Sequence, residues 1–197
     1  MVRCNGKNPA QGAQAPFLFM AMKGFKQNHF ELFGLTPGFV LEHERLEQAY
    51  REIQARVHPD RFAHAGEAER RASMQWTTRV NEAYRTLTSP VARAKYLLEL
   101  NGVDVAFETN TQMPSQFLMQ QMELREALEA AQEGKDAAAL DALRKDLTKA
   151  RGGLVDEIAQ LLDGRRDYRA AVESVRKLMF LDKLDAEIDA AYEAIEA

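Results

Sequence analysis

The sequence predicts an all-α protein in which a helical hairpin is followed by a three-helix bundle. Three observations lead to this prediction. Apolar residues repeat with helical spacing through most of the chain after residue 28. No segment alternates apolar and polar residues with the period of two that is typical of a strand. No proline follows Pro114, and the longest helical patterns lie in that part of the chain, where no proline would interrupt them.

The hairpin is predicted from two apolar stripes separated by a loop. The first stripe ends at Val57, because Pro59 disfavours helical geometry at the residue before it. The second stripe follows a loop through Gly66, and Ser89-Pro90 then opens a further helix that stops at Gly102. The two stripes consist of Leu46, Tyr50, Ile53 and Val57, and of Trp76, Val80, Ala83, Tyr84 and Leu87.

The bundle is predicted from three long helical patterns after Pro114. The first spans about residues 115–133, the second opens at Asp136, and the third starts near Asp167 and runs almost to the end. The connections at Gly134 and Gly164 are short, which favours antiparallel neighbours.

Charge and composition suggest two units and exclude several classes of protein. Residues 1–28 hold four basic and no acidic residues, 29–102 hold ten of each, and 103–197 hold twelve basic and twenty acidic residues. We expect a disordered tail or an added extension at 1–27, with Met20 or Met22 as a plausible natural start. The first domain should then span 28–102, the linker 103–114 and the bundle 115–197.

The overall balance is that of a globular protein with a core, with 197 residues of which 46% are apolar and 28% charged. The net charge of −4 gives no positive field for nucleic acid or anionic lipid. The longest apolar stretch contains Pro16 and is too short to cross a bilayer. Cys4 is the single cysteine, so an intramolecular disulfide and a cysteine-built zinc site are excluded.

One tripeptide between the two hairpin helices points to a specific function. His58-Pro59-Asp60 alone is a weak motif, and it is also what a plain helix-ending turn would contain. Its surroundings favour a functional site over a plain turn, because Arg51, Arg56 and Arg61 place basic charge beside the loop. We therefore expect an exposed cationic face next to a rigid turn.

The segment Arg56-Val57-His58-Pro59-Asp60-Arg61-Phe62, followed by Asn81-Glu82-Ala83-Tyr84-Arg85-Thr86-Leu87, resembles a J-domain. This resemblance implies a co-chaperone that stimulates ATP hydrolysis by a DnaK-type chaperone. In that family a basic helix docks on an acidic ATPase surface. By this resemblance Asp60 would engage a chaperone arginine, Pro59 would fix the loop and His58 would orient it. The chaperone-binding residues would be His58, Pro59, Asp60, Arg51, Arg56 and Arg61.

The second half resembles the HscB family, the J-proteins of bacterial iron–sulfur cluster assembly. The matching segments are Arg93-Ala94-Lys95-Tyr96-Leu97-Leu98, Phe117-Leu118-Met119, Met122-Glu123-Leu124-Arg125-Glu126 and Val175-Arg176-Lys177-Leu178-Met179-Phe180-Leu181-Asp182-Lys183-Leu184. The resemblance covers about residues 28–192 and implies an L-shaped molecule. Its partners would be an HscA-type chaperone and an IscU-type scaffold protein. The scaffold-binding residues would be Leu118, Met119, Met122, Glu123, Glu126 and Phe180.

The helix from Ser115 gives an independent reason to expect a partner. Phe117, Leu124, Leu128 and Ala131 share one narrow face at about 100° per residue, and this is the expected core stripe. Leu118, Met119 and Met122 fall on another sector, with acidic residues beside them. The alternative is that two neighbouring helices cover this second face. The apolar run 178–181 cannot all face one way, so exposure of Phe180 is expected.

We expect no metal site, no cofactor and no enzymatic activity. The histidines lack ligand spacing, the sequence has no Walker loop, and no nucleophile or glycine-rich loop accompanies His58 and Asp60. The expected role is that of a bacterial, cytoplasmic co-chaperone. Two other roles remain open: a general J-protein adaptor for unfolded clients, and a helical interaction scaffold in which the turn is only a turn.

Overall fold

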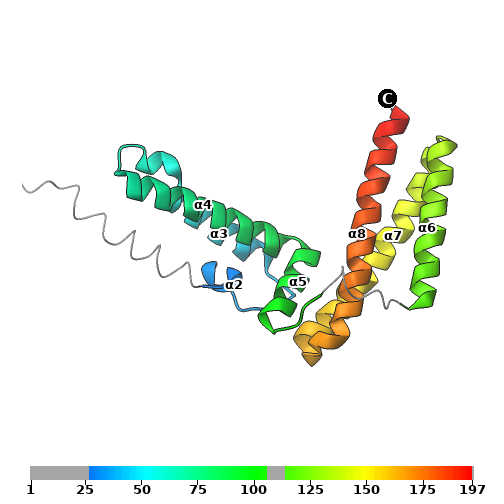
Figure 1. The fold of residues 1–197 in the computed structure, drawn as a ribbon, viewed down its shortest axis with the longest axis horizontal. Helices are drawn as coiled ribbons and strands as arrows, with labels where there is room; N and C mark the ends of the chain where they lie inside the picture. The colour runs from blue at the N-terminus through cyan, green and yellow to red at the C-terminus, as the bar shows by residue number, and fades with distance from the viewer. Residues whose placement is uncertain (1–26, 106–113, 197) are drawn as a thin grey trace, which may run out of the picture. The chain divides into compact units, whose positions relative to one another are not determined.

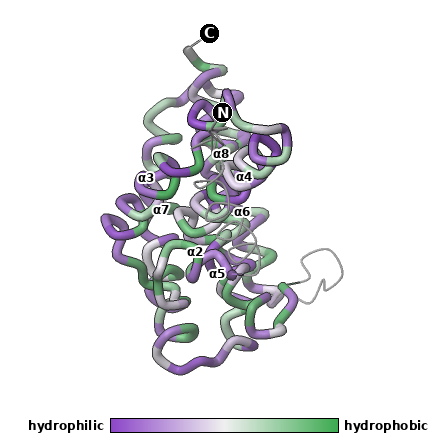
Figure 2. The backbone as a smooth tube through the Cα atoms, turned by 90° about the vertical axis from the view of Figure 1, so that its left-hand side faces the viewer, coloured by the Kyte–Doolittle hydropathy of each residue, from purple (hydrophilic) through white to green (hydrophobic). Residues whose placement is uncertain are grey.

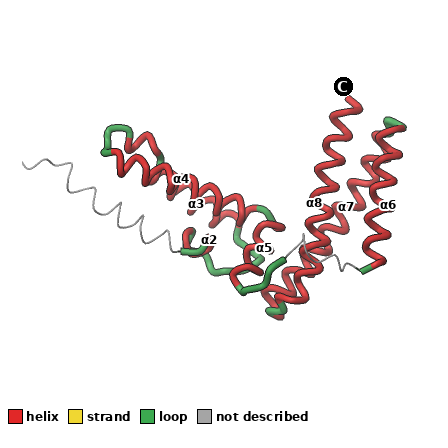
Figure 3. The backbone as a smooth tube through the Cα atoms, in the orientation of Figure 1, coloured by secondary structure: helices red, strands yellow, loops and turns green. Residues whose placement is uncertain are grey.

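The computed structural model describes residues 27–105 and 114–196. Every regular element within these ranges is a helix, which confirms the prediction of an all-α fold (Figures 1 and 3). Figure 2 shows apolar and polar residues interspersed along the helices, the pattern of helices that bury one face. The expected tail up to residue 26 and most of the expected linker lie outside the described residues.

The described residues divide into two units. The first unit contains the described residues up to Pro37 and Leu41–Ser89, and the second contains Gly38–Val40 and the described residues from Pro90 onward. We expected the first domain to extend to residue 102. The structure instead assigns α5 (Pro90–Leu100) to the second unit, because this helix packs against α8 (Tyr168–Glu196).

The first unit consists of α2 (His29–Leu32), α3 (His43–Val57), the 3₁₀ helix η2 (Pro59–Phe62) and α4 (Glu67–Thr88). Contacts of Tyr50 with Asn81 and of Val57 with Ser73 show that α3 and α4 run antiparallel, as the hairpin prediction required. The buried apolar residues of this unit are Phe30, Leu32, Phe33, Leu46, Val57, Trp76, Val80, Ala83 and Leu87.

A polar cluster joins α3 to α4 at the middle of the hairpin. The Tyr50 ring stacks on Tyr84 with centroids 4.0 Å apart. The Tyr50 hydroxyl donates to Asn81 Oδ1 at 3.1 Å, and Gln54 Nε2 donates to the same oxygen at 2.8 Å. These bonds satisfy partly buried polar groups and fix the register of the two helices.

The second unit contains the predicted bundle, formed by α6 (Ser115–Glu133), α7 (Ala137–Ala159) and α8, with a π-helical turn η3 (Gln160–Arg165) after α7. All three predicted helices begin within about a residue of the expected positions. The core of the bundle consists of Phe117, Leu128, Ala131, Leu140, Leu143, Leu147, Phe180, Leu181, Leu184, Ile188 and Ala191.

The two turns of the bundle lie at the predicted places, but the glycines are not their left-handed residues. The left-handed positions are Lys135, with φ of 49°, and Arg166, with φ of 54°. Asp136 and Asp167 then cap α7 and α8 by accepting bonds from the amides of Ala139 and Ala170, each at 3.0 Å. The side chains of Asp136 and Asp167 therefore cap the starts of these helices, and the turns before them need no glycine at the left-handed position.

Polar contacts fasten the remaining segments of the second unit. The Asp163 carboxylate accepts bonds from the amides of Phe39 and Val40, both at 2.8 Å. Arg93 lies over the Phe39 ring at 5.0 Å; burial lowers the pKa of its guanidinium, while the Asp163 charge acts in the opposite direction. The buried Arg176 donates to the Val105 carbonyl at 2.7 Å.

Ion pairs connect α7 and α8 along their exposed side. Arg151 pairs with Asp182 at 2.7 Å, and Arg144 pairs with Asp185 and Asp189. A network of several charges orients neighbouring helices better than an isolated exposed pair does. The packing of α7 on α8 is thus polar at its edge and apolar at its centre.

Candidate functional sites: an exposed loop and an exposed helix face

The first site is the loop between α3 and α4. Because Pro59 has no N–H and restricts His58, α3 ends at Val57 and η2 begins at Pro59. His58 Nδ1 accepts the Asp60 amide at 3.3 Å, so the imidazole caps this short helix. The loop is therefore a helix-ending turn, yet its side chains remain available, with 53% of His58 and 90% of Asp60 exposed.

The three arginines beside the loop have different surroundings. Arg51 pairs with Glu47 at 3.4 Å, and Arg56 pairs with Glu52 at 3.9 Å. In each pair the two residues are one helical turn apart on α3, and more than half of each arginine side chain is exposed. Arg61 instead turns back, and its Nη1 donates to the Ala55 carbonyl at 2.9 Å. The cationic face expected from the sequence thus consists of Arg51 and Arg56, partly offset by acidic neighbours.

The second site is the outer face of α6. Leu118, Met119 and Met122 are 43%, 61% and 62% exposed, which rules out the alternative that neighbouring helices of the described chain cover them. They lie about 100–200° around the helix from Phe117, which is buried. Glu126 is exposed in the same sector. The sequence prediction of an apolar face outside the core is confirmed for these three residues.

Phe180 departs from the prediction. We expected it to be partly exposed beside the α6 residues, but only 6% of it is exposed, because it belongs to the bundle core. Its ring meets Phe117 edge-on at 5.7 Å, and Arg125 lies over it at 5.7 Å. Within the apolar run 178–181, Met179 is the residue that is not fully buried, and it is half-buried. Phe180 therefore supports the exposed face of α6 from beneath.

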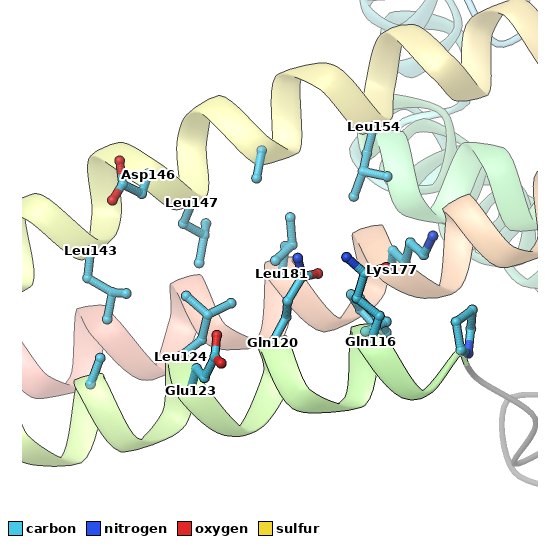
Figure 4. Close-up of a pocket in the computed structure, with 14 residues that line it drawn as sticks. Gln116, Gln120, Glu123, Leu124, Leu143, Asp146, Leu147, Leu154, Lys177 and Leu181 are labelled. Atoms are coloured by element: carbon cyan, nitrogen blue, oxygen red, sulfur yellow. The ribbon is translucent and has the colours of Figure 1, made fainter.

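Glu123 is next to Met119 around the axis of α6, at the border between the exposed face and a groove. It lines a groove of about 730 Å³ between α6 and α7, with α8 at its floor (Figure 4). Asp146 and Lys177 are the other charged residues of this groove, and Leu124, Leu147 and Leu181 are among its apolar residues. Glu126 thus lies within the exposed sector, and Glu123 lies at its edge facing the groove.

Sequence reasoning missed two residues that support these sites. Ser73 is fully buried, and its hydroxyl donates to the Val57 carbonyl at 2.6 Å, directly before the loop. It lies three residues before Trp76, so it could have been recognised as a polar position on the predicted apolar stripe of α4. Arg125 was predicted only as part of a matching segment, and its contact with Phe180 had no sequence pattern to reveal it.

Both sites are surfaces rather than cavities, which suits binding of macromolecules. Within the described residues, no group of three or more histidine, cysteine or acidic side chains is placed to hold a metal ion. None of the helices in the same residues combines the length and apolarity needed to span a membrane.

Comparison with known proteins identifies the family. A family model described as the HSCB C-terminal oligomerisation domain matches residues 113–189. A co-chaperone protein HscB homolog of Burkholderia thailandensis is 50% identical over 175 residues, which are 89% of this chain and 99% of that protein.

Two solved structures share the fold. Chaperone HscB from Vibrio cholerae has a TM-score of 0.76 and 36% identity, covering 86% of this chain and 99% of that one. The crystal structure of human co-chaperone protein HscB has a TM-score of 0.79 and 27% identity, covering 84% and 82%. Since half of the aligned residues are identical to an HscB homologue along nearly all of its length, this chain belongs to the HscB family of co-chaperones.

Proposed function

We propose that this co-chaperone stimulates the ATPase of an HscA-type, DnaK-like chaperone and delivers an IscU-type iron–sulfur scaffold protein to it. The observation that supports this best is the presence in one chain of two exposed sites of different chemistry. One is a polar, basic loop with the sequence His58-Pro59-Asp60, and the other is the apolar face formed by Leu118, Met119 and Met122.

The loop is suited to a charged partner. The Asp60 side chain is 90% exposed and lies 3.5 Å from His58 Nδ1, so its carboxylate is accessible to an arginine of the chaperone, which would form a bidentate bond with it. Arg51 and Arg56 lie on the preceding helix and would increase the association rate with an acidic ATPase surface. His58 would orient Asp60, since it already binds the Asp60 amide, and Pro59 would fix the backbone between them.

The α6 face is suited to a folded partner with an apolar patch. Methionine adapts to irregular surfaces, and two of the three exposed apolar residues here are methionines. Glu126 beside them and Glu123 at the edge of the groove would contact basic residues at the rim of the scaffold. We assign Phe180 a supporting role in this site, because it packs beneath α6.

The co-chaperone would act by differential binding. Its loop would favour the chaperone state in which hydrolysis proceeds, and a ligand shifts such an equilibrium only by its difference in affinity for the two states. ATP hydrolysis itself would take place in the chaperone, so we assign this chain no catalytic residue and no cofactor. The bacterial relatives support a role in the bacterial cytoplasm.

Two binding partners distinguish this proposal from a general adaptor. The full chain should be titrated with folded IscU-type scaffold and, separately, with a reduced unfolded polypeptide. Saturable binding of the folded scaffold alone is expected. Preference for the unfolded polypeptide would favour a general J-protein. In a separate ATPase assay with the chaperone, the absence of any stimulation would indicate that the chain is only an interaction scaffold.

A further inference from the structure

The junction between α3 and the loop leaves backbone carbonyls in need of donors. In a continuing helix the Val57 carbonyl would accept the amide of residue 61. That amide instead donates to the His58 carbonyl at 3.1 Å, because the chain has tightened into the 3₁₀ helix η2. A buried carbonyl without a donor would be costly, so another group must bind Val57.

Ser73 of α4 provides that donor. Its hydroxyl is 2.6 Å from the Val57 carbonyl, and the residue is fully buried. The Thr77 hydroxyl lies farther from the same carbonyl, at 3.4 Å, and it bonds the Ser73 carbonyl of its own helix at 3.0 Å. Ser73 is therefore the principal side-chain link between α4 and the last residue before the loop.

Other contacts of the loop differ from the Ser73 bond in their exposure to water. None of the η2 residues is fully buried, although Pro59 and Phe62 are half-buried and η2 packs against α4. Two side-chain hydrogen bonds also hold it: the Arg61 bond to the Ala55 carbonyl at 2.9 Å and the His58 cap on the Asp60 amide at 3.3 Å. Both of these bonds are exposed to water, which competes for them, whereas the Ser73 bond is buried.

We propose that Ser73 is a positioning residue for the loop: its buried hydroxyl fixes the end of α3, and thereby the direction in which His58 and Asp60 are presented to the chaperone. This inference rests on the proposed ATPase stimulation for its functional consequence. Its structural consequence is independent of any partner. Without the hydroxyl, the end of α3 should fray and the loop should sample several orientations.

Two substitutions of graded severity test the proposal. Ser73→Cys keeps the size and a weak donor, and Ser73→Ala removes the donor. The control is Val80→Ala, which truncates a fully buried side chain of the same helix two turns away and leaves the loop contacts intact. Measurements on the full chain are amide ¹⁵N order parameters of residues 58 and 60–62 and single-turnover ATPase of an HscA-type chaperone. Circular dichroism establishes that each variant is folded.

The order parameters of the loop should fall in the order serine, cysteine, alanine, while Val80→Ala leaves them unchanged. The concentration needed for half-maximal ATPase stimulation should rise by about three- to tenfold in Ser73→Ala, the effect of one hydrogen bond. Val80→Ala should lower the melting temperature without this rise.

Wild-type order parameters in the loop of Ser73→Ala would overturn the proposal, as would equal losses of stimulation in Ser73→Ala and Val80→Ala. If the wild-type chain does not stimulate the chaperone, the proposed function fails, and the order parameters alone decide the role of Ser73. If Ser73→Ala does not fold, the comparison of Ser73→Cys with the wild type decides it.

Discussion

The loop site and the α6 site differ in what holds them in place. The loop is held by hydrogen bonds to backbone atoms, and none of the side chains of η2 is buried. The α6 residues are placed by a helix whose opposite face is packed in the core through Phe117, Leu128 and Ala131. The orientation of the loop therefore depends on polar bonds and on half-buried contacts with α4, whereas that of the α6 face depends on the bundle as a whole. Substitutions in the loop should therefore affect function without affecting stability. At the α6 site, substitutions of the exposed residues should affect binding, and substitution of the supporting core residue should affect stability.

The largest effect is expected where the α6 site meets the core. Phe180→Ala should destabilise the chain by about 3–5 kcal/mol, because it removes a buried aromatic ring and leaves a cavity under α6. Met119→Ala, at an exposed position on the same helix face, is the matched control and should leave the denaturation midpoint almost unchanged. Urea unfolding followed by circular dichroism measures both. Similar midpoints for the two variants would mean that Phe180 is a surface residue.

The next effect concerns scaffold binding. Replacing Leu118, Met119 and Met122 together by serine should weaken binding to the IscU-type scaffold by more than about a hundredfold. Each residue contributes roughly 1–3 kcal/mol when it is fully desolvated in a complex. Met74→Ser, which alters an equally exposed methionine on α4, should bind the scaffold normally. A calorimetric titration of folded samples measures this, and a triple variant with wild-type affinity would refute the site.

The loop should show the opposite separation, with loss of function and no loss of stability. Asp60→Asn and His58→Gln should each reduce ATPase stimulation by more than about tenfold. The first loses a charge-assisted bond to the chaperone, and the second loses the imidazole that orients Asp60. The melting temperature should stay near the wild-type value because both side chains are exposed. A large fall in melting temperature would show that the tripeptide serves as a capping turn for the fold.

The smallest effect is expected from the basic helix. Arg51→Glu or Arg56→Glu should slow association with the chaperone several-fold at low salt. The difference should shrink as salt rises, because the Debye length is about 10 Å at 0.1 M ionic strength. Lys183→Glu is the control, an exposed lysine of α8 that also pairs with a carboxylate one turn away. If stopped-flow association rates do not vary with salt, these arginines do not steer association with the chaperone and are only part of a solvated face.

Much of the fold could be predicted because it follows from local rules. Pro59 ends α3 and Pro90 opens α5, and each effect involves only neighbouring residues. The helices of the bundle follow from long apolar stripes. The place of α5 could not be predicted in this way, because the helix is linked to the first unit by sequence but packs on α8.

The candidate sites were predictable in their exposed residues and not in their supports. Leu118, Met119 and Met122 depart from the core stripe, and this departure is visible in the sequence. Phe180 lies in an apolar run in which periodicity alone does not determine which residue turns inward. The role of Ser73 depends on a bond to a carbonyl sixteen residues earlier, which is a property of the tertiary structure.

The central claim is that one chain joins two exposed sites that act together on one chaperone. Single-turnover ATPase of an HscA-type chaperone tests it most directly, measured with the wild type, the Leu118/Met119/Met122 triple serine variant and Asp60→Asn, each with and without the scaffold. The triple variant should retain stimulation in the absence of scaffold but lose the additional stimulation with scaffold, and Asp60→Asn should lose both. Full additional stimulation by the triple variant, or any wild-type level of stimulation by Asp60→Asn, would contradict it.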